Sequence, residues 1–219
     1  MGAKAAIAAT AAIAAAGIDK SEIDLVIYAA LNPDCFFPGN GVFIEELLGL
    51  KTAGAVVVQA TEEDRGVLAS VLHSQGRFAK DVWLEVPTAV VRERVTPGLI
   101  EQGRHYPTMD GELVFKHATR RFCEAVNEVL ERGGHTIDEV DLRVPHQANQ
   151  RITEAVGSRM GLPAQKVVSN IERYGNTTAA TIPIALSEAV AAGRIQPGNL
   201  VVTLAFGSGF TWGADLIRW

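Results

Sequence analysis

The sequence predicts an α/β fold in which helices surround mixed sheets and two halves of the chain repeat one βαβ-type pattern. Apolar, β-branched segments typical of strands alternate with amphipathic or alanine-rich segments typical of helices. A repeat is visible directly, because residues 17–27 read GIDKSEIDLVI and residues 134–144, 117 positions later, read GHTIDEVDLRV. A looser echo joins GLKTAGAVVV at 49–58 to GLPAQKVVSN at 161–170. Two matches in the same order predict a duplicated scaffold.

In the first half, the alanine-rich start predicts a helix that closes on Gly17, followed by a turn and a strand. The run is too weakly apolar for a good secretory signal, and no polar cleavage region follows it. A strand is expected at 66–73, and a loop-rich stretch at 75–110.

The second half begins with a helix over Thr119–Arg132, whose apolar face is predicted to contain Phe122, Val126, Val129 and Leu130. The remaining elements expected are strands at 141–145, 166–169, 199–206 and 212–219 and helices at Asn149–Met160 and 177–193. Pro183 inside the last helix predicts a kink or a displaced start. No linker rich in Pro, Gly or Ser separates independent domains.

Composition excludes several classes of protein. The chain has 219 residues, a net charge of −5, 47% hydrophobic and 21% charged residues, so it is of ordinary globular composition. This charge disfavours binding to nucleic acid, and no apolar stretch is long enough to span a bilayer. Cys35 and Cys123 cannot staple a secreted scaffold and have no metal-ligand spacing. We therefore expect a cytoplasmic protein without a metal site.

Three polar or glycine-rich turns depart from what packing requires: 144–149 (VPHQAN), 173–178 (RYGNTT) and 206–209 (FGSG). His146 stands where the first copy of the repeat has Ala29, so the scaffold itself does not need a histidine there. Taken singly, His146 could be a structural residue, Asn176 a helix cap and the glycine turn a simple hairpin. Ligands bind open α/β sheets beyond the carboxyl ends of strands, where His146 and Asn176 are predicted to lie.

From about Glu62 to Trp219 the chain resembles β-ketoacyl-acyl carrier protein synthase III, a condensing enzyme of the thiolase superfamily. The matching stretches are MDGELVFKHA, VDLRVPHQANQRI, YGNTTAATIPIAL and AFGSGFTWGADLIRW, and residues 5–55 resemble the early helix, strand and loop of that family. The resemblance implies a thiolase-like fold of two similar halves around a pseudo-twofold axis. It also divides the chain into 1–58, a remnant of the N-terminal half, and 59–219, the C-terminal half.

The resemblance implies an acyltransferase of fatty acid or related acyl biosynthesis. It would condense an acyl thioester from acyl-CoA with malonyl-acyl carrier protein, with loss of carbon dioxide and no further cofactor. His146 and Asn176 would be neutral donors to the malonyl thioester oxygen, and the backbone N–H near Ser208 would hold the acyl oxyanion. Ser208 itself is not expected to be a nucleophile, because no G-x-S-x-G elbow surrounds it.

Three further positions are assigned to substrate or carrier binding by the same resemblance. Arg151 matches the docking arginine for the acidic carrier protein, Asn149 the contact to the pantetheine arm, and Phe206 belongs to the closing glycine-rich segment.

The family's nucleophilic cysteine is not visible in this sequence. GLKTAGA runs directly into VVVQATEEDRGVLASVLHSQG, so the block that carries the cysteine, its helix and the main dimer strand is missing, as is the family's opening strand. We do not expect Cys35 or Cys123 to replace it. Three hypotheses remain: residues not included here that complete an ordinary homodimeric enzyme, a remnant that only decarboxylates malonyl thioesters, or a non-catalytic module that binds the carrier protein.

Overall fold

The computed structural model describes residues 3–23, 58, 60–87 and 95–219. The chain groups into two compact units, of which the first is Met1–Glu63 with Thr178–Pro183 and the second is Asp64–Thr177 with Ile184–Trp219. The predicted boundary between residues 58 and 59 stays a prediction. None of the helices that the structure describes is long and apolar enough to cross a membrane.

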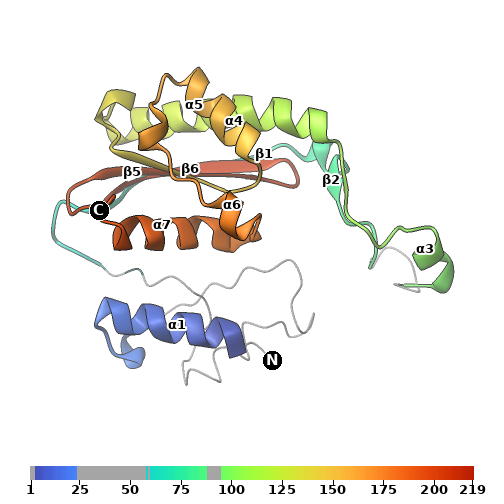
Figure 1. Cartoon of the computed structure of the whole chain (residues 1–219), viewed down its shortest axis with the longest axis horizontal. Helices are drawn as coiled ribbons and strands as arrows, with labels where there is room; N and C mark the ends of the chain where they lie inside the picture. The colour runs from blue at the N-terminus through green and yellow to red at the C-terminus, as the bar shows by residue number, and fades with distance from the viewer. Residues whose placement is uncertain (1–2, 24–57, 59, 88–94) are drawn as a thin grey trace. The chain divides into compact units, whose positions relative to one another are not determined.

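The second unit is built on a four-stranded mixed sheet (Figure 1). The strand order is β1-β6-β5-β4, with β1 antiparallel to β6, β6 antiparallel to β5, and β5 parallel to β4. Because β4 and β5 are parallel, their carboxyl ends meet at the same edge of the sheet. The strands are β1 (Gly66–Ser74), β4 (Leu142–Pro145), β5 (Leu200–Gly207) and β6 (Thr211–Arg218).

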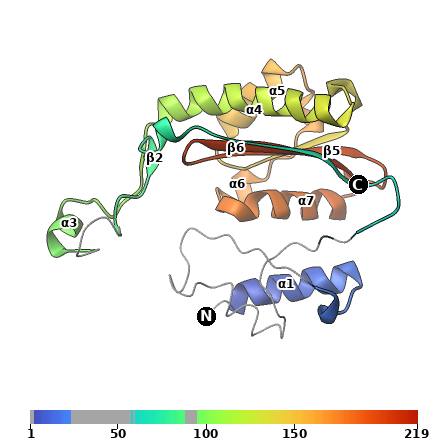
Figure 2. The same ribbon diagram turned by 180° about the vertical axis from the view of Figure 1, so that it is seen from behind.

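Helices cover both faces of this sheet, as predicted (Figures 1 and 2). Helices α4 and α5 lie on one face, and α6 and α7 lie on the other. The apolar face of α4 contacts β1, β5 and β6 and contains the four residues predicted for it, all at most 3% exposed. The bounds are α4 (Gly111–Gly133), α5 (Gln150–Arg159), α6 (Ile171–Tyr174) and α7 (Thr181–Ala191).

The described residues between β1 and α4 form only short elements, in line with the loop-rich stretch predicted there. Two strands of two residues each form an antiparallel ribbon around a five-residue helix. The elements are η2 (Gly76–Phe78), β2 (Val82–Trp83), α3 (Pro97–Glu101) and β3 (Thr108–Met109).

The repeat noticed in the sequence has a matching local structure in both copies. Helix α1 (Ala3–Ala16) closes on Gly17 with φ +68°, and α4 closes on Gly134 with φ +71°. A short 3-10 helix follows in each copy, η1 (Lys20–Glu22) and η3 (Ile137–Glu139), and each ends in a glutamate that accepts a hydrogen bond from its cap N–H. The first copy's next strand lies outside the described residues.

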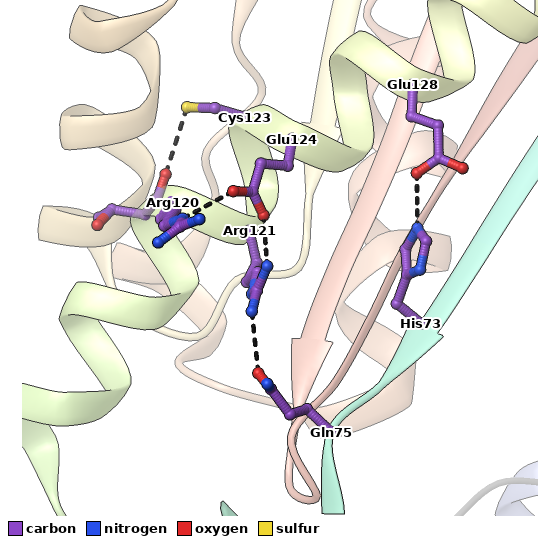
Figure 3. A network of polar contacts seen from close by, with 8 residues as sticks. His73, Gln75, Arg120, Arg121, Cys123, Glu124 and Glu128 are labelled. Carbon is purple, nitrogen blue, oxygen red and sulfur yellow. Dashed lines mark hydrogen bonds and ion pairs between the residues drawn. The ribbon is translucent and has the colours of Figure 1, made fainter.

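Polar contacts fasten β1 to α4 on the side of the sheet that α4 covers (Figure 3). The Nε2 of His73 lies 2.6 Å from Oε2 of Glu128. Just beyond β1, Oε1 of Gln75 accepts a hydrogen bond from Arg121, which also donates to Glu124. These contacts fix the orientation of α4 over the edge of the sheet.

Two predicted elements differ from the structure, and a third differs in a way that the sequence allowed for. Helix α4 begins at Gly111 rather than Thr119, because the side chain of Asp110 caps it by accepting the backbone N–H of Leu113. The expected strand at 166–169 is reduced to one bridge between Val167 and Arg143. The last helix starts at Thr181 rather than 177, the displaced start that Pro183 predicted, with η5 (Thr178–Ala180) before it and η4 (Ala164–Lys166) earlier.

Candidate functional site

His146 lies directly beyond the carboxyl end of β4. Its backbone N–H donates to the carbonyl of Leu204 on β5 at 2.7 Å, which continues the parallel pairing by one residue. The side chain is half-buried, and burial lowers the pKa of this imidazole below its ordinary value. At neutral pH the ring is therefore uncharged, which leaves it one N–H to donate to an oxygen that gains negative charge.

The turn after β5 lies at the same edge of the sheet as His146, because β4 and β5 are parallel. Gly207 pairs with Thr211 across this turn, and Gly209 takes a φ of +133°. A Cβ on Gly209 would lie 2.9 Å from Cγ2 of Thr211, so the turn requires glycine. The hydroxyl of Ser208 donates to the carbonyl of Val82. Its side chain therefore has a structural contact, in keeping with the prediction that it is not a nucleophile.

Asn176 lies two residues after α6. That helix ends at Gly175, whose N–H donates to the carbonyl of Ile171 at 2.8 Å and whose φ is +64°. Asn176 is exposed in this structure. Its predicted role as a donor to substrate stays a prediction.

Gln147 connects the turn of His146 to the segment that leads to Asn176. Its side chain is 2% exposed. Its Nε2 donates to the carbonyls of Pro145 (2.7 Å) and Val168 (3.2 Å), and its Oε1 accepts the N–H of Asn170 (3.2 Å). The sequence analysis gave this residue no role. The sequence feature that could have pointed to Gln147 is its place among the polar residues that follow a buried strand.

Asn149, predicted to contact the pantetheine arm, is the N-cap of α5. Its Oδ1 accepts the backbone N–H of Arg151 at 2.9 Å. The guanidinium of Arg151 is exposed and makes no hydrogen bond or ion pair within the described part of the chain. This side chain is thus available to an acidic partner.

Phe206, predicted to bind substrate, is 8% exposed and belongs to the core. Its ring lies 4.9 Å from that of Phe210 and 6.3 Å from that of Phe122, measured between centroids. The structure gives it a packing role, and contact with substrate stays a prediction.

The described cysteine has the environment of a packing residue. Cys123 lies within α4, where its Sγ donates to the carbonyl of Thr119 at 3.3 Å (Figure 3). Burial raises the pKa of its thiol, which disfavours the reactive thiolate. Cys35 lies outside the described residues.

A cavity of about 300 Å³ lies beside α5. None of the predicted site residues lines it. Its walls include Thr153, Gly157, Leu162, Val167 and Ser169. The candidate reactive positions are instead at the end of the sheet where β4 and β5 finish: His146 follows β4, and the turn of Ser208 follows β5.

Comparisons with known proteins identify the relatives of this chain. The family model "3-Oxoacyl-[acyl-carrier-protein (ACP)] synthase III C terminal" matches residues 130–219. A β-ketoacyl-[acyl-carrier-protein] synthase III from Symbiobacterium thermophilum is 36% identical over 270 residues, covering 97% of this chain and 81% of that protein. A second, from Desulfotalea psychrophila, is 47% identical over 167 residues, covering 76% of this chain and 51% of that protein.

Solved structures give the same result. The 3-oxoacyl-[acyl-carrier-protein] synthase III from Aquifex aeolicus has a TM-score of 0.84 and 28% identity, covering 98% of this chain and 83% of that one. The enzyme of the same name from Pseudomonas aeruginosa has a TM-score of 0.84 and 27% identity, covering 100% of this chain and 83% of that one. The predicted thiolase-like α/β fold is therefore confirmed.

The comparison with the Symbiobacterium protein also bears on the predicted missing block. That alignment extends over 270 positions, and this chain has 219 residues, so at least 51 aligned positions have no residue here. Such a gap fits the predicted internal loss. With this degree of identity over most of both sequences, the chain belongs to the β-ketoacyl-[acyl-carrier-protein] synthase III family.

Proposed function

We propose that the protein is an acyltransferase of fatty acid biosynthesis that condenses an acyl thioester with malonyl-acyl carrier protein. The observation that carries this proposal is the similarity to a β-ketoacyl-[acyl-carrier-protein] synthase III along 97% of the chain. His146 and the glycine turn support it, because they follow the carboxyl ends of the neighbouring parallel strands β4 and β5.

The first chemical task is decarboxylation of the malonyl group. The bond between its carboxylate carbon and its α-carbon breaks, carbon dioxide leaves, and the electron pair passes to the α-carbon and the thioester oxygen. Fixed neutral donors stabilise that oxygen better than water does, because they need no reorganisation during the reaction. An uncharged His146 and the carboxamide of Asn176 have the required chemistry. Each donor of this kind contributes on the order of 3 kcal/mol to the transition state.

The second task is to hold the acyl thioester while the new carbanion attacks its carbonyl carbon; the carbon–sulfur bond then breaks and the thiolate leaves. A backbone N–H beside Ser208 is proposed to bind the oxyanion that then forms, since the glycine turn leaves its main chain close to the sheet edge. The acyl group itself requires a thiolate, and the raised pKa of Cys123 makes that residue a poor choice.

A second candidate function is decarboxylation of malonyl thioesters without condensation. The observation that favours it is the set of at least 51 aligned positions that have no residue in this chain, together with the packing environment of Cys123. The proposed decarboxylation groups, His146 and Asn176, would still be present. A module that only binds the carrier protein is the remaining alternative, and it would depend on Arg151.

We also propose the acyl carrier protein as the partner that Arg151 binds. An exposed guanidinium suits an acidic protein surface. A cytoplasmic location and a homodimer are proposed on the resemblance to the family. Size-exclusion chromatography with light scattering tests the dimer, and a monomer at micromolar concentration would contradict it.

The test of the proposed function follows two products of the purified full chain. Carbon dioxide release from malonyl-acyl carrier protein reports decarboxylation, and the β-ketoacyl product formed with added acyl-CoA reports condensation. His146→Ala and Asn176→Ala should each slow carbon dioxide release on the order of 100-fold or more. Unchanged release in both variants would overturn the assignment of the donors.

Labelled acyl-CoA separates the two candidate functions. A stable thioester label together with β-ketoacyl product supports condensation, whereas carbon dioxide without label or condensation product supports the decarboxylase. Binding of the carrier protein that survives His146→Ala but falls with Arg151→Glu, with neither product formed, would leave the binding module.

A further inference from the structure

Three polar residues are linked by hydrogen bonds across the elements that bear the proposed donors, through the backbone N–H of Asn170 on one side and its side chain on the other. Gln147 follows His146, Asn170 precedes α6, and Glu188 lies on α7. Gln147 and Asn170 are each 2% exposed. None of the three has been given a role in the reaction so far.

Gln147 uses both its donor and its acceptor atoms inside the protein. As described above, its Nε2 donates to the carbonyls of Pro145 and Val168, and its Oε1 accepts the N–H of Asn170. The first carbonyl belongs to the last residue of β4, and the other two groups belong to the segment that follows the Val167 bridge. The carboxamide therefore sets the spacing between that segment and the turn of His146.

Asn170 makes hydrogen bonds to both α6 and α7. Its carbonyl accepts the N–H groups of Arg173 and Tyr174, which starts α6. Its Nδ2 donates to Oε2 of Glu188 at 2.9 Å. A single buried asparagine thus contacts the glutamine on one side and the glutamate on the other.

Glu188 fastens α6 to α7. Besides Asn170, its carboxylate accepts two hydrogen bonds from Arg173 (2.8 and 2.7 Å) and one from the hydroxyl of Tyr174 (2.6 Å). These contacts lower the pKa of Glu188 to about 2, with the hydrogen bond from Tyr174 first among the causes. The carboxylate is therefore ionised at neutral pH. Asn176 lies two residues after Tyr174, so the contacts of Glu188 are close to it along the chain.

We propose that Gln147, Asn170 and Glu188 are positioning residues that hold the turns of His146 and Asn176 in one fixed relation. This inference rests on the proposed function, since it presumes that the two turns serve one substrate oxygen. Both donors lie on turns rather than inside long elements, so their placement depends on contacts of this kind. A displacement of about 1 Å at a reacting centre costs on the order of 100-fold in rate.

The kinetic test uses Gln147→Met, which keeps the side-chain length but removes all three hydrogen bonds, and Glu188→Gln, which removes the charge. We expect kcat for carbon dioxide release to fall about 10- to 100-fold with KM changed by less than about 3-fold. In a background with both His146→Ala and Asn176→Ala, Gln147→Met should cause little further loss, because it acts only through these two donors. Gln196→Met, an exposed glutamine that donates to the carbonyl of Gly193, is the matched control and should have no effect.

A measurement without substrate keeps this inference separable from the proposed function. Side-chain NMR of the full protein should show that Gln147→Met shifts the Asn176 amide signals and that Glu188→Gln shifts the His146 ring signals. The ring of His73, on β1, serves as the internal control and should not shift. If these shifts are observed but the unmodified protein has no activity, the positioning role is supported and the proposed function is overturned. Unshifted Asn176 and His146 signals in folded variants would overturn the positioning chain whatever the activity.

Discussion

Replacing Arg143 with methionine should stabilise the protein. Arg143 lies within β4 and is 1% exposed. Its Nη1 lies 3.7 Å from Sδ of Met160, but its Nε and Nη2 have no hydrogen-bond partner, and no carboxylate among the described residues forms an ion pair with it. A buried cation without a counter-ion opposes folding, because the folded state removes its hydration without replacing it.

The size of the effect follows from the pKa of Arg143. Burial lowers it from 12.5 to about 10. A difference of about 2.5 units, at about 1.4 kcal/mol per unit, corresponds to a penalty of about 3 kcal/mol at neutral pH. Methionine fills less volume than arginine, so we expect a gain in the free energy of unfolding of roughly 1 to 3 kcal/mol. At about 2 to 4 °C per kcal/mol, Tm should rise by roughly 2 to 12 °C.

The pH dependence provides a sign check on this reasoning. A base whose folded pKa is lowered is penalised in full below that pKa, and the penalty is relieved only as the pH rises above it. The advantage of Arg143→Met should therefore stay constant from about pH 6 to about pH 9.

Urea unfolding followed by circular dichroism measures the difference between the two proteins. Arg151→Met, which removes an exposed guanidinium, is the matched control and should change stability by less than about 0.5 kcal/mol. An Arg143→Met protein no more stable than the original, or an advantage that shrinks between pH 6 and pH 9, would refute the reasoning.

Four further predictions concern single positions. Gly134→Ala forces alanine into the left-handed conformation that ends α4, so stability should fall by about 1 kcal/mol in urea unfolding, and no loss would contradict the cap. The raised pKa of the Cys123 thiol predicts that iodoacetamide modifies it more slowly at pH 7 than it modifies glutathione, as mass spectrometry can measure; an equal rate would contradict its burial. Asn149→Ser keeps the N-cap and Asn149→Ala loses it, at about 1 kcal/mol; an equal rise in KM for malonyl-acyl carrier protein in both would indicate substrate contact rather than capping. The hydrogen bond from the N–H of Thr136 lowers the pKa of Glu139 to about 2. The ionised carboxylate therefore stabilises the fold above pH 4.5, and this stabilisation is lost as the pH falls toward 2. Glu139→Gln should remove that part of the acid dependence in urea unfolding measured at several pH values.

The elements that the sequence predicts well are those whose signal is local. The apolar face of α4 repeats every three or four residues, and the strands around 66–73 and 199–206 are runs of apolar and β-branched residues. The repeated glutamates Glu22 and Glu139 are explained in the same way, because each accepts the N–H of the residue three positions before it. Such signals depend only on neighbours along the chain.

The predictions that failed depend on contacts between distant residues. The run 166–169 is as β-branched and apolar as a strand, but Val167 pairs only with Arg143 and the rest of the run makes other contacts. The charge of Arg143 gave no sign that it would be buried, because an arginine in a strand is ordinarily placed on the solvent side. The free energy that decides such cases comes from packing, which the order of residues alone does not show.

The same distinction between local signals and distant contacts applies to the candidate site. The sequence predicted His146 at the carboxyl end of a strand, and it lies directly beyond β4. Asn176 was predicted at such an end too, but it follows helix α6 instead. The residues that connect the turn of His146 to α6 and α7 could not be predicted from the sequence. Gln147 reaches Asn170 across 23 positions, and Asn170 reaches Glu188 across 18 more. On the proposal that His146 and Asn176 are the donors, their placement on turns depends on these distant polar contacts. Substitutions at Gln147, Asn170 or Glu188, which have no chemical role of their own, should then reduce activity without unfolding the protein.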